Sequence, residues 1–71
     1  MNAQEIKHLI KTTAFFAALV ELVKEAGHEI GRRELEAPAQ PCDEIEVDGR
    51  KAIVVSKSLL GGGYIYILLN D

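Results

Sequence analysis

The sequence predicts an α+β domain in which one N-terminal amphipathic helix packs on a three-stranded antiparallel sheet. The first 26 residues carry apolar side chains at helical spacing. Residues 43–69 instead contain runs of β-forming residues separated by turns with glycine. Between these halves lie two prolines, which interrupt regular structure. At 71 residues, the chain has room for a single domain over 1–71.

We expect the helix over residues 3–26. Asn2 can cap its first turn, and Glu5 is placed to complete a capping box with Asn2. Gly27 then provides a C-terminal stop. At 100° per residue, one face of this helix forms an apolar stripe toward the core, made of Ile6, Leu9, Ile10, Thr13, Phe16, Ala17, Val20 and Val23.

A second apolar group lies on the opposite side of the same helix. It consists of Phe15, Leu19 and Leu22, with Ala18 beside them. The middle of the helix is therefore apolar nearly all round, which is unusual for a surface helix of a small monomer. Either another part of the domain folds over this group, or the group forms a dimer or partner surface.

Residues 27–42 are expected to form a connector. Pro38 and Pro41 favour an extended, non-helical stretch. Whether residues 32–37 form helix or strand stays open at this stage.

Residues 43–69 predict a β-meander, with strands over 43–48, 51–57 and 64–69 and a glycine-rich loop over 58–63. Asp48-Gly49 signals a hairpin turn. A two-residue turn would set Ile45 opposite Ala52. We prefer a three-residue loop, which sets Glu46 opposite Arg50. That register also places one apolar set on a common face, namely Ile45, Val47, Ile53 and Val55.

The middle and last strands are apolar on both faces, as is typical of strands buried on both sides. One helix covers only one face of a three-stranded sheet. We therefore expect another molecule to cover the second face, which agrees with a homodimer.

Charge is distributed unevenly, with a net value of −3. Residues 34–48 contain six acidic residues and no Lys or Arg. This balance disfavours a protein that binds nucleic acid by neutralising phosphates. Glu44, Glu46 and Asp48 form an acidic row with a spacing of about 6.7 Å. The row is a candidate binding site for a basic partner; the alternative is a solvated edge strand that uses charge to prevent aggregation.

No pattern indicates catalysis or a cofactor. Cys42 is the only cysteine, and His8 and His28 lack metal-ligand spacing. The glycines at 61–63 are followed by a strand rather than the helix that a phosphate loop requires. We therefore expect no enzyme, no cofactor and no metal.

The expected compartment is the cytoplasm, because the chain has no cysteine framework and its apolar run at residues 14–20 is too short to span a bilayer. The expected function is a small non-catalytic protein-interaction module. It would be an antagonist or inhibitor, of the kind that viruses and mobile elements encode, binding a partner's basic surface through the acidic row. The alternatives are a small dimeric nucleic-acid-binding regulator that uses Arg32 and Arg33, and an orphan subunit of a larger assembly.

Overall fold

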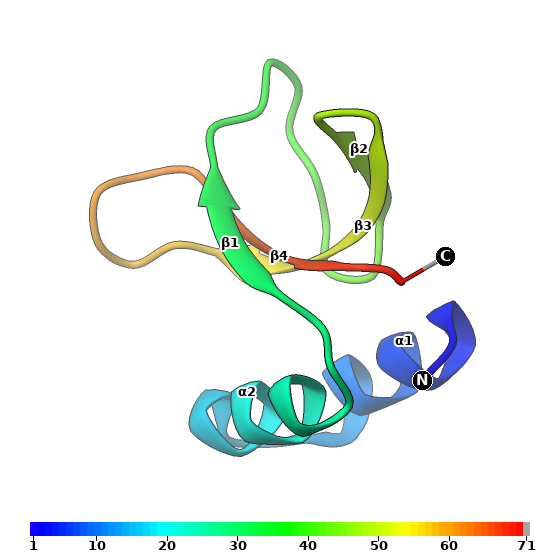
Figure 1. Cartoon of the computed structure of the whole chain (residues 1–71). Coiled ribbons are helices and arrows are strands. Elements are labelled where there is room, and N and C mark those ends of the chain that lie inside the picture. Colours follow the sequence, from blue (N-terminus) through cyan, green and yellow to red (C-terminus); the bar gives the residue numbers. More distant parts are fainter. Residues whose placement is uncertain (71) are drawn as a thin grey trace.

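The computed structural model describes residues 1–70 and consists of two N-terminal helices followed by a four-stranded antiparallel sheet (Figure 1). The strands lie in the order β1-β4-β3-β2. The α+β class is confirmed, whereas the numbers of helices and strands differ from the prediction. The elements are α1 (Ala3–Thr12), α2 (Phe16–Glu25), β1 (Ile30–Arg33), β2 (Glu44–Val47), β3 (Arg50–Lys57) and β4 (Tyr64–Leu68).

The single helix predicted over 3–26 is wrong, because the chain becomes extended between α1 and α2. Thr13 and Phe15 both have β-region backbone angles. Thr12 and Thr13 are β-branched and have low helix propensity. A straight helix over 3–26 would measure roughly 36 Å, longer than the 28 Å of the molecule's longest dimension. The break allows both segments to pack on one sheet.

The break also changes which side of α2 is buried. Leu19 is only 4% exposed and Val23 is fully buried, whereas Phe16 is 48% exposed. The predicted positions of Leu19 on the outer face and Phe16 on the core stripe are therefore both wrong. The predicted faces depend on a rotation of 100° per residue through one unbroken helix. The extended residues between α1 and α2 change the direction in which the side chains of α2 point.

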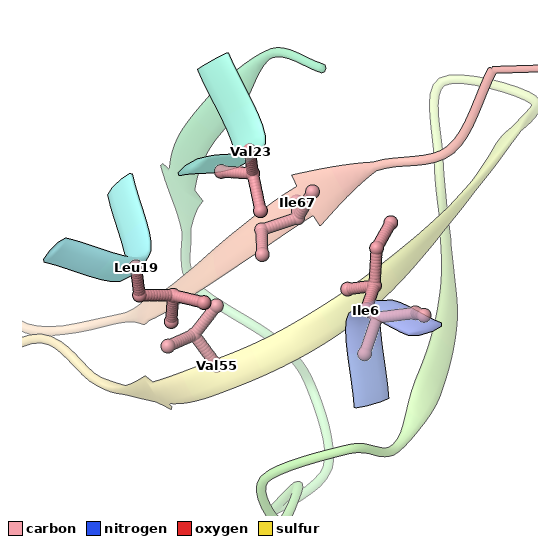
Figure 2. Close-up of a cluster of buried hydrophobic side chains, with 6 residues drawn as sticks. Ile6, Leu19, Val23, Val55 and Ile67 are labelled. Atoms are coloured by element: carbon pink, nitrogen blue, oxygen red, sulfur yellow. The ribbon is translucent and has the colours of Figure 1, made fainter. Parts of the chain in front are cut away.

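The main core lies between the helices and one face of the sheet. Figure 2 shows Ile6 of α1 and Leu19 and Val23 of α2 meeting the side chains of Val55 and Ile67. Ile53, also fully buried, completes this cluster. Each helix thus contributes to one shared core.

The β2–β3 hairpin adopts the two-residue turn, so the preferred three-residue register is wrong. Val47 pairs with Arg50 and Glu46 pairs with Lys51. Asp48 and Gly49 both have positive φ, at 51° and 80°. This pattern matches a type I′ turn, whose twist suits the flanking strands. The turn geometry outweighs the predicted charge pair, and Ile45 and Val47 lie on the opposite face from Ile53.

Part of the predicted connector forms the edge strand β1, which pairs with β4. Gly31 lies opposite Tyr66 in this ladder. The Tyr66 ring leans over Gly31 so closely that a Cβ there would lie 2.4 Å from the Tyr66 hydroxyl. A side chain at this position would therefore force the Tyr66 ring to move away from β1.

The second face of the sheet is buried within the chain, contrary to the expectation that another molecule covers it. Ala52 and Val54 are fully buried by the chain itself, because both have 0% accessible surface. A bulge between Val54 and Ser56 bends β3, and the β2–β3 hairpin rises toward the end of β1 (Figure 1). The connector closes the structure, since Cys42 N–H donates to the Val54 carbonyl and Val54 N–H donates to the Asp43 carbonyl.

Candidate interaction surfaces

The acidic row begins beside helix α1. Glu44 lies opposite Ile53, whose side chain faces the helices. Lys7 Nζ donates to Glu44 Oε2 at 2.8 Å. This hydrogen bond and the positive charge of Lys7 lower the pKa of Glu44. Glu44 is thus half exposed and already has a cationic partner.

At its other end, the row contacts strand β1. The Arg33 guanidinium donates two hydrogen bonds to Asp48, from Nη1 to Oδ1 at 3.1 Å and from Nη2 to Oδ2 at 2.9 Å. The Asp48 carboxylate raises the pKa of Arg33, so Arg33 keeps its charge. This bidentate pair joins the end of β1 to the β2–β3 turn.

Only Glu46 in the acidic row has no ion-pair partner within residues 1–70. Its cross-strand neighbour is Lys51. An open groove of about 350 Å³ runs here, lined by Glu44, Ile45, Glu46, Gly49 and Lys51. Two of the three carboxylates in the acidic row thus have counter-charges that other elements of the chain supply. The row forms a surface of mixed charge.

A group of exposed apolar side chains lies away from the acidic row, at the start of α2 and in the β3–β4 loop. We call this group the apolar surface. It consists of Phe15 and Phe16 at the start of α2 and Leu59 and Leu60 in the β3–β4 loop. Their exposed fractions are 77%, 48%, 97% and 84%. Figure 1 shows the loop extending on the side where α2 begins. A groove of about 320 Å³ joins the two parts, lined by Phe16, Ile65, Leu59, Leu60 and residues 56–58.

Hydrogen bonds hold the β3–β4 loop in a defined shape. Arg32 Nη1 donates to the carbonyls of Gly61 and Gly62, at 3.0 and 2.7 Å. Ser58 N–H donates to the Gly63 carbonyl, and Ser58 Oγ donates to the Leu60 carbonyl. The two leucines thus face solvent from a loop whose backbone makes several hydrogen bonds within the chain.

The predicted oligomer face is divided by the structure. Phe15 belongs to the apolar surface, and Leu19 lies in the core. Leu22 is 43% exposed but lines a different groove, together with Met1 and with His8 and Leu9 of α1. Sequence reasoning missed Leu59 and Leu60 as surface residues. The available signal was a pair of leucines between a serine and three glycines, in a segment already predicted to be a loop.

The residues considered for catalysis or metal binding do not converge. Cys42 Sγ is half buried and donates to the Lys7 carbonyl at 3.6 Å. His28 is buried, with Nδ1 2.9 Å from the Leu68 carbonyl and Nε2 without a partner. Within residues 1–70, no three His, Cys, Asp or Glu side chains gather into a possible metal site.

Arg32 and Arg33, the basic pair of the nucleic-acid alternative, are both engaged within the chain. Arg32 binds loop carbonyls and Arg33 binds Asp48. Their engagement lowers the support for that alternative, because phosphate binding would compete with these contacts. Across the described residues, neither helix has the length and apolar character needed to cross a membrane.

No protein-family model, curated protein or solved structure matches this chain. The functional argument therefore depends on the geometry of the two surfaces.

Proposed function

We propose that this protein is a non-catalytic protein-interaction module that binds through the apolar surface. The observation that carries the proposal is the display of Leu59 and Leu60, 97% and 84% exposed, by a loop fixed through its own hydrogen bonds. Single exposed leucines are common on proteins. Here Leu59 and Leu60 line one groove together with Phe16, and exposed Phe15 precedes Phe16 in the chain. Such a grouping of exposed apolar side chains is typical of an interaction site.

The ordered loop also favours binding. An interface loses affinity when flexible side chains and loops must be fixed on association. Here Arg32 and Ser58 already hold the loop backbone. Aromatic side chains in the centre of an interface supply much of its binding energy, and Phe15 and Phe16 are available for this purpose.

The test is affinity capture from an extract of the source organism with quantitative mass spectrometry. We compare the wild-type protein with a Leu59→Ser, Leu60→Ser double variant. Both side chains lie in solvent, so circular dichroism and thermal melting should show an unchanged fold. We expect proteins captured by the wild type to be lost from the double variant.

Leu22→Ser is the matched control, because it removes an exposed leucine from a different groove. It should capture the same proteins as the wild type. Equal capture by the wild type and the double variant would contradict the proposal.

The second candidate function is the predicted inhibitor that binds a basic partner through the acidic row. Its support is Glu46, which lies in an open groove and has no ion pair within residues 1–70. Glu46→Gln removes this charge without disturbing the Lys7–Glu44 or Arg33–Asp48 pairs.

For this candidate, binding to a captured basic partner should weaken, with a slower association rate at low salt. Glu36→Gln, an equal charge change in the exposed connector, serves as the control. Identical association rates for Glu46→Gln and the wild type would exclude the acidic row as the site.

A further inference from the structure

We infer that a second copy of this chain occupies the apolar surface, forming a two-fold dimer in which the β3–β4 loop of each copy lies in the groove of the other. The inference rests on the proposed function of this surface and names its partner. It concerns the loop leucines Leu59 and Leu60 and the groove lined by Phe16 and Ile65.

The shape of the surface supports a second copy. The apolar surface contains a protruding element and a recess next to each other, because the highly exposed loop leucines form one wall of the groove and Phe16 and Ile65 line the rest of it. In a two-fold interface, both copies contribute the same patch. A protrusion beside a recess is complementary to itself when the symmetry axis passes between them. Each loop can then fill the partner's groove.

The charges around the surface also permit self-association. Lys57 is the one charged residue that lines the groove. Glu34 lies at the other side of the loop, where its Oε1 would be 3.4 Å from a Cβ at Gly62. Arg32 also lies at the loop, where it donates to the Gly61 and Gly62 carbonyls. The rim thus carries charges of both signs, and its apolar centre brings no like charges together. Self-association through the acidic row would instead place Glu44 and Glu46 against the same carboxylates of the second copy.

The apolar area is sufficient for a specific dimer. With roughly 200 Å² for each fully exposed large side chain, the exposed fractions of the four residues amount to on the order of 600 Å² per chain. Two copies would then bury about 1,200 Å² from these residues alone, at the lower end of the range for stable interfaces. Flanking residues of the groove add to this area.

The first experiment is sedimentation equilibrium over the micromolar range. The wild type should give twice the chain mass of 7.8 kDa. Leu60→Asp places a charge in each half of the apolar centre, so the dissociation constant should rise on the order of a hundredfold. Leu22→Asp introduces the same charge in the other groove and should leave the dissociation constant unchanged.

A second experiment tests the arrangement within the dimer. In a sample that mixes isotope-labelled and unlabelled chains, filtered NOEs should connect the Leu59 and Leu60 methyl groups of one copy with the Phe16 ring of the other. Arg32→Ala should raise the dissociation constant by about tenfold, because the loop must then be ordered on binding. A dimer without these NOEs would overturn the proposed arrangement.

A wild-type chain that stays monomeric throughout the concentration range would overturn the inference. The proposed function would still stand in that case if the Leu59→Ser, Leu60→Ser variant lost proteins that the wild type captures. Cosedimentation with vesicles of anionic phospholipid tests whether the apolar surface binds a membrane instead. If the wild-type monomer cosediments with the vesicles and the Leu59→Ser, Leu60→Ser variant does not, the surface binds membranes and both proposals are overturned.

Discussion

Helices α1 and α2 are both ten residues long, yet their sequences account for them in different ways. In α1, the Asn2 side chain accepts from Glu5 N–H and the Glu5 side chain accepts from Asn2 N–H, which completes a capping box. Helix α2 begins after Phe15, whose side chain makes no capping hydrogen bond, and its first turn has no acidic residue. Local sequence therefore supports α1 far better than α2.

Because local sequence supports α2 poorly, other contacts must hold this helix in place. Helix α2 is held by tertiary packing, through Leu19 and Val23 in the shared core. Phe15 occupies the N-cap position of α2, where a polar side chain would stabilise the helix better, and both Phe15 and Phe16 are exposed to solvent. A local rule broken without compensation within the chain is typical of a functional site. The exposed start of α2 is consistent with the binding role proposed for the apolar surface.

The largest expected effect tests which residues hold α2 in place. Leu19→Ala should lower the free energy of unfolding by about 2–5 kcal/mol, because the side chain is buried in the core. Phe16→Ala should cost about 1 kcal/mol or less, because nearly half of the side chain is already exposed. Urea unfolding of dilute samples measures both values. If Phe16→Ala lowered the free energy of unfolding more than Leu19→Ala, Phe16 would belong to the core and Leu19 to the surface, as the single-helix prediction has it.

The next effect concerns the two helix starts. Asn2→Ala should lower the free energy of unfolding by about 1 kcal/mol, because it removes the capping box. Phe15→Asn should raise it by about 0.5–1 kcal/mol, because Phe15 already has the extended backbone that a capping residue adopts. The same variant should weaken the dimer. Thermal unfolding in the Leu60→Asp background separates the two effects, and a destabilised Phe15→Asn chain would refute the comparison.

The smallest effect concerns the contact between α1 and β2. Lys7 lowers the pKa of Glu44 below its ordinary value of 4.5. The stabilisation is therefore present above pH 4.5 and is lost as the pH falls through the lowered pKa. Lys7→Met should raise the pKa of Glu44 and make the acid-side loss of stability shallower. An NMR titration of the Glu44 side chain measures the shift, with Lys24→Met as the charge-matched control.

The sequence predicts those parts of the fold that local patterns determine. Asn2 and Glu5 identify the start of α1, and the β-forming runs locate β2, β3 and β4 within a residue or two. The break before α2 was missed because apolar residues continue through it, so periodicity does not reveal the change of phase. Strand β1 was missed because its four residues include Gly31, Arg32 and Arg33, which do not alternate as a strand.

The candidate surfaces were less predictable because they depend on tertiary contacts. The partners of Glu44 and Asp48 are Lys7 and Arg33, which come from other elements of the chain. The two possible registers of the β2–β3 hairpin differ by one residue, and the preference of Asp48-Gly49 for a two-residue turn outweighs the charge pair that the other register would form. Leu59 and Leu60 became a candidate site only when the loop was placed beside the start of α2.

The pairing of β1 with β4 has a consequence for synthesis of the protein. Ile30 pairs with Ile67, and Leu68 N–H donates to the Glu29 carbonyl. Strand β1 therefore has no partner in the sheet until residues 64–68 have emerged from the ribosome. During that interval the core residues of α2 also lack Ile67. Such non-local closure slows folding, and it leaves the apolar core side chains of α2 without this sheet partner until β4 has been made.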